Sequence, residues 1–151
     1  MSSPCPPAPA AAGPPVVVLS GCTREAALVA RIAAAVDHAG ARLRLPDSPD
    51  LPEDPTSEDL IAARRVRSRR QMDAIADPAT IAVVVANTAQ DGRPNHVEPS
   101  ALAEIAVAFA HRVPVFLLHG LPLPYLDELT AWDVVCLHAD LDRLGALLTA
   151  A

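Results

Sequence analysis

The chain has 151 residues, which is typical of one domain, and 51% of them are hydrophobic while 20% are charged. This balance predicts a folded core rather than a disordered chain. All 12 basic residues are arginine, so lysine chemistry, such as a Schiff base or a Walker-A phosphate loop, is excluded. The formal net charge of -6 argues against nucleic acid or an anionic membrane as a partner.

The first 15 residues are rich in proline and alanine, which predicts a flexible tail (1–15) before a single domain (16–151). They lack the basic start and leucine-rich run of a secretory signal. No apolar run is long enough to span a membrane. Cys5, Cys22 and Cys136 are an odd number without C-x-x-C spacing, which indicates a reducing cytoplasm. The histidines are scattered, so the sequence predicts no metal site, and no motif in it indicates a cofactor.

The first expected strand is Val16–Ser20, a short β-branched run. A helix over Thr23–Ala39 follows, because its apolar residues recur with helical spacing. Thr23 is the expected N-cap, and Gly40 closes the helix. Ala41–Leu45 is a second, shorter strand.

Four prolines make Pro46–Pro55 a loop. The second helix is expected over Thr56–Ala76, with Thr56 or Ser57 as its cap and acidic residues in its first turn. Ile81–Ala86 is apolar on both faces, which is typical of a central strand of a parallel sheet.

The second half of the chain continues the alternation. A proline opens a helix over Pro99–His111, and a strand follows at Val113–Leu118. The remaining expected elements are a helix over Leu121–Ala131, a strand over Val134–His138 and a helix over Asp140–Ala150 with its first aspartate as cap.

Strands alternating with helices predict an α/β fold, a flavodoxin-like or Rossmann-like three-layer sandwich with five parallel strands in the order 2-1-3-4-5. Ligands of such sheets bind beyond the carboxyl ends of the strands, between strands 1 and 3. The third strand is followed by Asn87 instead of an aspartate, and there is no lysine, which argues against a response-regulator receiver. The short SGCTRE turn and the few aromatic residues argue against a flavodoxin.

Glu104 is the only charged residue in the run PSALAEIAVAFA. A carboxylate there either faces the ligand crevice for catalysis or lies on a solvent-facing stripe beside Arg112, and both interpretations fit the sequence. Asp73, near the end of the second helix, either reaches the crevice or is solvated. Asn87 either faces the crevice or serves as a turn residue.

A basic cluster lies on the second helix, and its members cannot all share one face. It is either a solvated surface, or a source of one phosphate contact from Arg69 or Arg70. Nucleic-acid binding through it lacks stacking aromatic residues. The members of the cluster are Arg64, Arg65, Arg67, Arg69 and Arg70.

Three stretches carry a resemblance to a known family: VVVLSGCTREAALVARIAAAVDHAGARLRLP, DAIADPATIAVVVAN and HVEPSALAEIAVAFAHRVPVFLLHGLPLPYLDEL. Together they resemble the nucleoside 2-deoxyribosyltransferase-like superfamily over about residues 16–144, most specifically over 96–128. The resemblance implies that Glu104 is the catalytic nucleophile, which attacks the anomeric carbon of a nucleoside or nucleotide. Asp73 falls within a residue of the family aspartate that orients the sugar or protonates the base, so the resemblance implies this role for Asp73.

The same resemblance implies a set of substrate-binding positions at the strand ends and the start of the third helix. Gly21 and Cys22 fall on the family's Gly-Ser loop, with a cysteine in place of the usual serine. Asn87 ends the third strand, His96 stands where tyrosine is common, and Ser100 falls on a small polar position near the sugar or phosphate.

The expected function is therefore hydrolysis or exchange of the base of a nucleoside or nucleotide, which makes the chain a hydrolase or transferase of nucleotide metabolism. The resemblance also implies a homo-oligomer, with contacts through the helices over Pro99–His111 and Leu121–Ala131. The alternative is a non-catalytic nucleotide-binding or protein-interaction member of the same fold. Glu98 favours this alternative, because it places a second negative charge where glycine is common.

Overall fold

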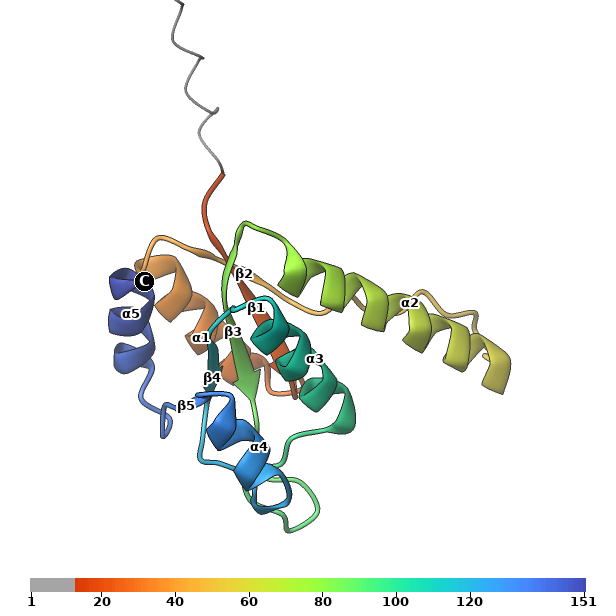
Figure 1. The fold of residues 1–151 in the computed structure, drawn as a ribbon. Coiled ribbons are helices and arrows are strands. Elements are labelled where there is room, and N and C mark those ends of the chain that lie inside the picture. The colour runs from red at the N-terminus through yellow and green to blue at the C-terminus, as the bar shows by residue number, and fades with distance from the viewer. Residues whose placement is uncertain (1–12) are drawn as a thin grey trace, which may run out of the picture.

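The computed structural model describes residues 13–151 and shows one sheet with helices on both of its faces (Figure 1). The strands are β1 (Val16–Gly21), β2 (Arg42–Arg44), β3 (Thr80–Ala86), β4 (Val115–Leu117) and β5 (Val135–Cys136). The helices are α1 (Ala26–His38), α2 (Ser57–Ala76), α3 (Pro99–Ala110), a short 3-10 turn η1 (Leu123–Tyr125), α4 (Leu126–Ala131) and α5 (Leu141–Ala150).

All five strands are parallel and lie in the order β2-β1-β3-β4-β5, which confirms the predicted α/β sandwich and its strand order. β1 pairs with β3 along its whole length, from Val16 opposite Thr80 to Gly21 opposite Ala86. The carboxyl ends of β1 and β3 therefore lie next to each other, at the point where the strand order reverses.

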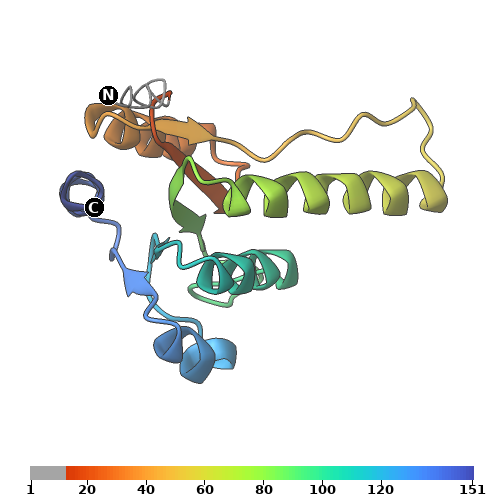
Figure 2. The same cartoon turned by 45° about the horizontal axis from the view of Figure 1, so that its top comes forward.

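Two apolar cores separate the layers. α1 and α5 cover one face through a core that includes Ile32 and Leu144. α2, α3 and α4 cover the other face, and their core includes Ile75, Ile105 and Leu129. Figure 2 shows these two groups of helices on opposite sides of the sheet. Aliphatic side chains dominate both cores, as the low aromatic content requires.

The period-2 alternation of strand side chains sets which polar groups reach the α2 and α3 face. In β1, Val16 and Val18 belong to the core on that face, whereas Val17 and Leu19 belong to the opposite core. Ser20 continues the first set, so its hydroxyl points toward α2 and α3. β1 thus delivers one buried polar group to the layer that carries Glu104.

The helix caps confirm most of the sequence predictions. Thr56 accepts a hydrogen bond from the Asp59 amide while the Asp59 carboxylate accepts from Thr56, which forms a capping box at the start of α2. Asp140 caps α5 in the same way through the Arg143 amide. The prediction of Thr23 as a cap is wrong. α1 begins later, at Ala26, because the chain is still extended at Glu25.

α2 extends beyond the body of the protein. Figures 1 and 2 show its N-terminal part, in yellow, running outward from the sheet beside the loop that precedes it. Its buried residues, Gln71, Ala74 and Ile75, all lie in the last two turns. The projecting part leaves Leu60 and Ile61 49% and 60% exposed. These two apolar side chains therefore have little cover within the described chain.

The predicted tail lies mostly outside the described residues, since the structure begins at residue 13. Pro15 directly precedes β1, and its carbonyl accepts a hydrogen bond from the Arg42 amide of β2 at 2.8 Å. Among residues 13–151, no helix has the length and apolar character needed to cross a membrane.

Gly21, at the end of β1, provides a test of this packing. Its φ is +84°, and an added Cβ would lie 3.0 Å from the Ala86 carbonyl oxygen in β3. Gly40 has a similar φ of +79° but open space around it. We expect Gly40→Ala to cost about 1 kcal/mol of folding free energy from the left-handed backbone alone. Gly21→Ala should cost about 1–3 kcal/mol more, because β1 and β3 must also separate.

The measurement is urea denaturation of both variants beside the wild type. Equal losses of stability at the two positions would contradict the close approach of Gly21 to β3.

Candidate functional site

Glu104 lies in the second turn of α3, half-buried, and faces the carboxyl end of β1. The buried Ser20 hydroxyl donates a hydrogen bond to its Oε2 atom. This contact joins two segments that are 84 residues apart in the sequence. Of the two interpretations that the sequence left open, a solvent-facing stripe beside Arg112 does not fit, because the carboxylate is half-buried and bonded to a residue at a strand end.

Gln71 supplies a second donor from α2. Its side chain is 3% exposed, and its amide nitrogen donates to the Leu19 carbonyl oxygen at 2.8 Å and to Glu104 Oε2 at 3.5 Å. The first of these bonds anchors α2 to β1. The second bond is long and therefore weak, so it stabilises the negative charge of Glu104 only slightly.

Both donors fall on the same oxygen of Glu104. Within residues 13–151, no side chain or backbone group donates a hydrogen bond to Oε1. The carboxylate is therefore held through Oε2 while Oε1 is left free to meet an electrophile. A nucleophilic carboxylate needs this arrangement: a fixed orientation with one oxygen unengaged.

Opposing effects set the charge state of Glu104. Burial raises the pKa of its carboxyl above the ordinary 4.5, and the nearby Glu98 charge raises it further. The hydrogen bonds from Ser20 and Gln71 and the positive charge of Arg67 lower the same pKa, and burial is the largest effect. The site therefore contains a partly desolvated carboxylate that its neighbours help to keep ionised.

The structure does not bring Asp73 to Glu104. Its side chain is exposed and makes no hydrogen bond or ion pair with any described residue. Two residues of helix turn the direction of a side chain by about 200°. Gln71 consequently faces Glu104 while Asp73 faces solvent. The predicted role of Asp73 is corrected: the contact from α2 is an amide instead of a carboxylate.

Asn87 is buried just beyond β3, and its amide is used to hold the loop after β4. Its nitrogen donates to the Gly120 carbonyl at 2.8 Å, and its oxygen accepts from the His119 amide at 2.8 Å. Asn95 binds the same loop by accepting from the Gly120 amide at 3.2 Å. This geometry supports the turn-residue interpretation of Asn87, because its side chain joins two loops at the carboxyl edge of the sheet by hydrogen bonds.

The other predicted positions lie around this edge. Gly21 and Cys22 directly follow Ser20, and the Cys22 amide donates to the Ala86 carbonyl at 3.2 Å. Ser100 is exposed in the first turn of α3. His96 lines a separate hollow of about 400 Å³ with Tyr125 and other residues of the Gly92–Val97 and Leu121–Tyr125 segments.

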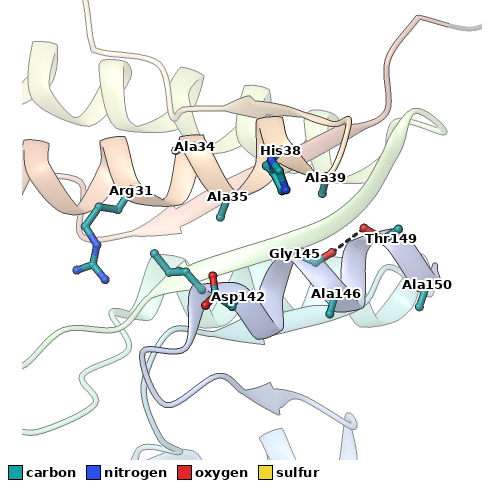
Figure 3. Close-up of a pocket in the computed structure, with 11 residues that line it drawn as sticks. Arg31, Ala34, Ala35, His38, Ala39, Asp142, Gly145, Ala146, Thr149 and Ala150 are labelled. Carbon is teal, nitrogen blue, oxygen red and sulfur yellow. Dashed lines mark hydrogen bonds between the residues drawn. The ribbon is translucent and has the colours of Figure 1, made fainter.

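A larger hollow lies on the opposite face of the sheet. It has a volume of about 980 Å³ and runs between α1 and α5 (Figure 3). Small residues such as Ala35 and Gly145 line most of it, and the Thr149 hydroxyl donates a hydrogen bond to the Gly145 carbonyl. It contains none of the predicted site residues. Among residues 13–151, no group of three or more His, Cys, Asp or Glu side chains is arranged to hold a metal ion.

Sequence reasoning missed Gln71 and did not assign Ser20 a contact with Glu104. Each carried a usable signal. Ser20 is in phase with the Val16 and Val18 side chains of a buried strand, and Gln71 lies four residues before the buried Ile75. A polar residue in phase with a buried face needs a partner there.

Comparison with known proteins finds no matching family model and no matching curated protein.

The raised pKa of Glu104 predicts how stability depends on pH. Folding favours its protonated form, so this stabilising contribution is complete below the ordinary pKa of 4.5 and is lost as the pH rises through the raised value. Glu104→Gln cannot titrate. The stability of the wild type should therefore fall relative to Glu104→Gln as the pH increases from 4 toward neutrality.

Urea denaturation at several pH values measures this difference. Asp73→Asn, which removes a carboxylate that faces solvent, is the matched control substitution. A wild type that gains stability relative to Glu104→Gln as the pH rises would show that Glu104 is stabilised as an anion by folding.

Proposed function

We propose that the chain is an enzyme that cleaves the N-glycosidic bond of a nucleoside or nucleotide, with Glu104 as the nucleophile. One observation carries the proposal: Glu104 is half-buried at the carboxyl end of β1, with Oε2 held by Ser20 and Gln71 and Oε1 free. The resemblance to nucleoside 2-deoxyribosyltransferases adds the substrate class. The place of the carboxylate, beside the switch point between β1 and β3, is where this architecture binds ligands.

The chemistry follows from the free oxygen. Oε1 of Glu104 attacks the anomeric carbon, and the bond from that carbon to the base nitrogen breaks with its electron pair leaving on the base. The base takes a proton from water, which leaves hydroxide, and this hydroxide takes up the proton that the next attacking group loses. Water, or a second base, then attacks the same carbon and releases the Glu104 carboxylate, which gives hydrolysis or exchange respectively. Throughout, the negative charge of Glu104 stabilises the positive charge that develops on the sugar.

A non-catalytic nucleotide-binding or interaction protein is the second candidate. Glu98 favours it, because its charge stands at the start of α3 and already acts on Glu104. The amide of Gln71, in place of an acid, points the same way, since it cannot give a proton to a leaving base. Only an assay of bond cleavage separates the two candidates.

We expect wild-type protein to release free base from at least one member of a panel of deoxynucleosides and deoxynucleoside monophosphates, followed by chromatography. Glu104→Gln should reduce this release by about 1,000-fold or more, because the nucleophile is gone. Ser20→Ala should reduce it by about tenfold, as expected for one hydrogen bond to a charged group. Asp73→Asn should leave it unchanged, since that side chain faces solvent.

Absence of release by the wild type, or equal release by Glu104→Gln, would remove the catalytic function and leave the non-catalytic candidate. A glycosyl adduct on the peptide that contains Glu104, detected by mass spectrometry in a quenched reaction, would identify the attacking group directly.

We also propose that the chain is a homo-oligomer of the cytoplasm. Two exposed apolar surfaces offer contacts: Leu60 and Ile61 on the projecting part of α2, and Leu123 and Leu126 near α4. The second surface corresponds to the helices expected from the sequence. The first lies on the same helix as Gln71, about three turns nearer its N-terminus. Cys22 and Cys136 are free thiols, in keeping with a reducing compartment.

Ile61→Glu and Leu126→Glu distinguish these surfaces in an analytical ultracentrifuge. If α2 forms the contact, Ile61→Glu should yield monomers because a charge is placed in an apolar interface, while Leu126→Glu should leave the oligomer intact. The reverse result would assign the contact to α4, and a monomeric wild type would remove the proposal.

A further inference from the structure

The five arginines of the basic cluster separate by face once they are placed on α2. Arg70 forms an ion pair with Asp47 at 3.5 Å, so its charge is already matched. Arg64, Arg67 and Gln71 follow the pattern i, i+3, i+7. The two arginines therefore lie on the same face of the helix as Gln71. Arg65 and Arg69 point away from that face.

Arg67 occupies the point where α2 leaves the body of the protein. It lies one helical turn (about 5.4 Å) before Gln71, whose amide contacts Glu104. Its side chain is exposed and, with Arg64, lines a hollow of about 500 Å³ along the projecting part of α2. Among the residues that the structure describes, no carboxylate lies within ion-pair distance of Arg67.

The charges around Glu104 include that of Arg67. The Glu98 charge raises the pKa of Glu104, and Arg67 is the one cation among the described residues whose charge lowers it. Arg67 thus stands at the rim of the candidate site with its guanidinium donors unused by the described chain. A planar guanidinium of this kind binds the oxygens of a phosphate in a bidentate manner.

We propose that Arg67, supported by Arg64, binds the phosphate group of a nucleoside monophosphate whose sugar lies at Glu104, and that monophosphates are therefore preferred over nucleosides. This rests on the proposed function for the role of Glu104. It replaces Arg69 and Arg70, which the sequence offered for a phosphate contact. Arg69 faces away from the site, and Arg70 is paired with Asp47.

The test compares base release from a deoxynucleoside and from its 5′-monophosphate. Wild type should prefer the monophosphate. Arg67→Ala should raise KM for the monophosphate by about ten- to a hundredfold, the range expected for a hydrogen-bonded charge. Its loss of kcat/KM for the nucleoside should be at least about tenfold smaller, because the nucleoside loses only the effect of Arg67 on the charge of Glu104. Arg69→Ala is the matched control and should change neither substrate. Far-ultraviolet circular dichroism of both variants checks that α2 still folds.

Three results would overturn the inference: a wild type that prefers the nucleoside, an equal loss for both substrates in Arg67→Ala, or an equal effect of Arg69→Ala. An equal loss would assign Arg67 only to maintaining the charge of Glu104.

Calorimetric titration of the wild type and Arg67→Ala with the monophosphate and with inorganic phosphate separates this inference from the proposed function. If no base is released but the monophosphate binds and Arg67→Ala weakens it at least tenfold, the phosphate site stands and the catalytic function fails. Binding of inorganic phosphate alone, or binding that Arg67→Ala does not change, overturns the phosphate site.

Discussion

The hydrogen bond from the Ser20 hydroxyl to Glu104 is the contact on which the candidate site depends. A glutamate half-buried on an otherwise apolar helix loses hydration, and desolvation alone would favour protonation or rotation of the side chain into water. Ser20 replaces one lost water contact from inside the protein. Because Ser20 belongs to a strand paired along its whole length with β3, its position is fixed by the sheet. The direction of the carboxylate is therefore set by the most rigid part of the fold.

The sheet provides this positioning through its alternation of side chains. Residues of β1 that share a face with Ser20 are valines of the core beneath α2 and α3, so a serine at that phase has no solvent to face. Its hydroxyl must find an acceptor, and Glu104 is the acceptor that α3 brings within reach. The buried amide of Gln71 fills the same layer from α2 and ties that helix to the Leu19 carbonyl. The apolar core and the polar site are thus one packed layer.

Periodicity explains which features the sequence could predict. The β-branched runs and the helical spacing located the five strands and the five α-helices, and the strand order followed from their alternation. The helix expected over Leu121–Ala131 is instead a 3-10 turn followed by the shorter α4. Glu104 stood out because it interrupts an apolar run. The partner on α2 was missed, because Asp73 was considered on charge alone and moving from position 73 to position 71 turns the side chain to another face of the helix. The projection of α2 past the sheet was equally hidden, since helix periodicity carries no information on where the covering layer ends.

An amide at position 71 also determines what kind of chemistry the site supports. Gln71 can donate a hydrogen bond to Glu104, but it does not exchange protons near neutral pH. Ser20 is likewise a donor whose hydrogen is already directed at Oε2. Neither neighbour in hydrogen-bond contact with Glu104 is therefore an acid or a base, so the chemistry available to the carboxylate is that of its charge and its free oxygen. Under the proposed function, such a site would favour substrates that bring a leaving group able to depart without an enzymic proton, and it would depend on binding energy from a remote part of the substrate to hold the reacting carbon in place.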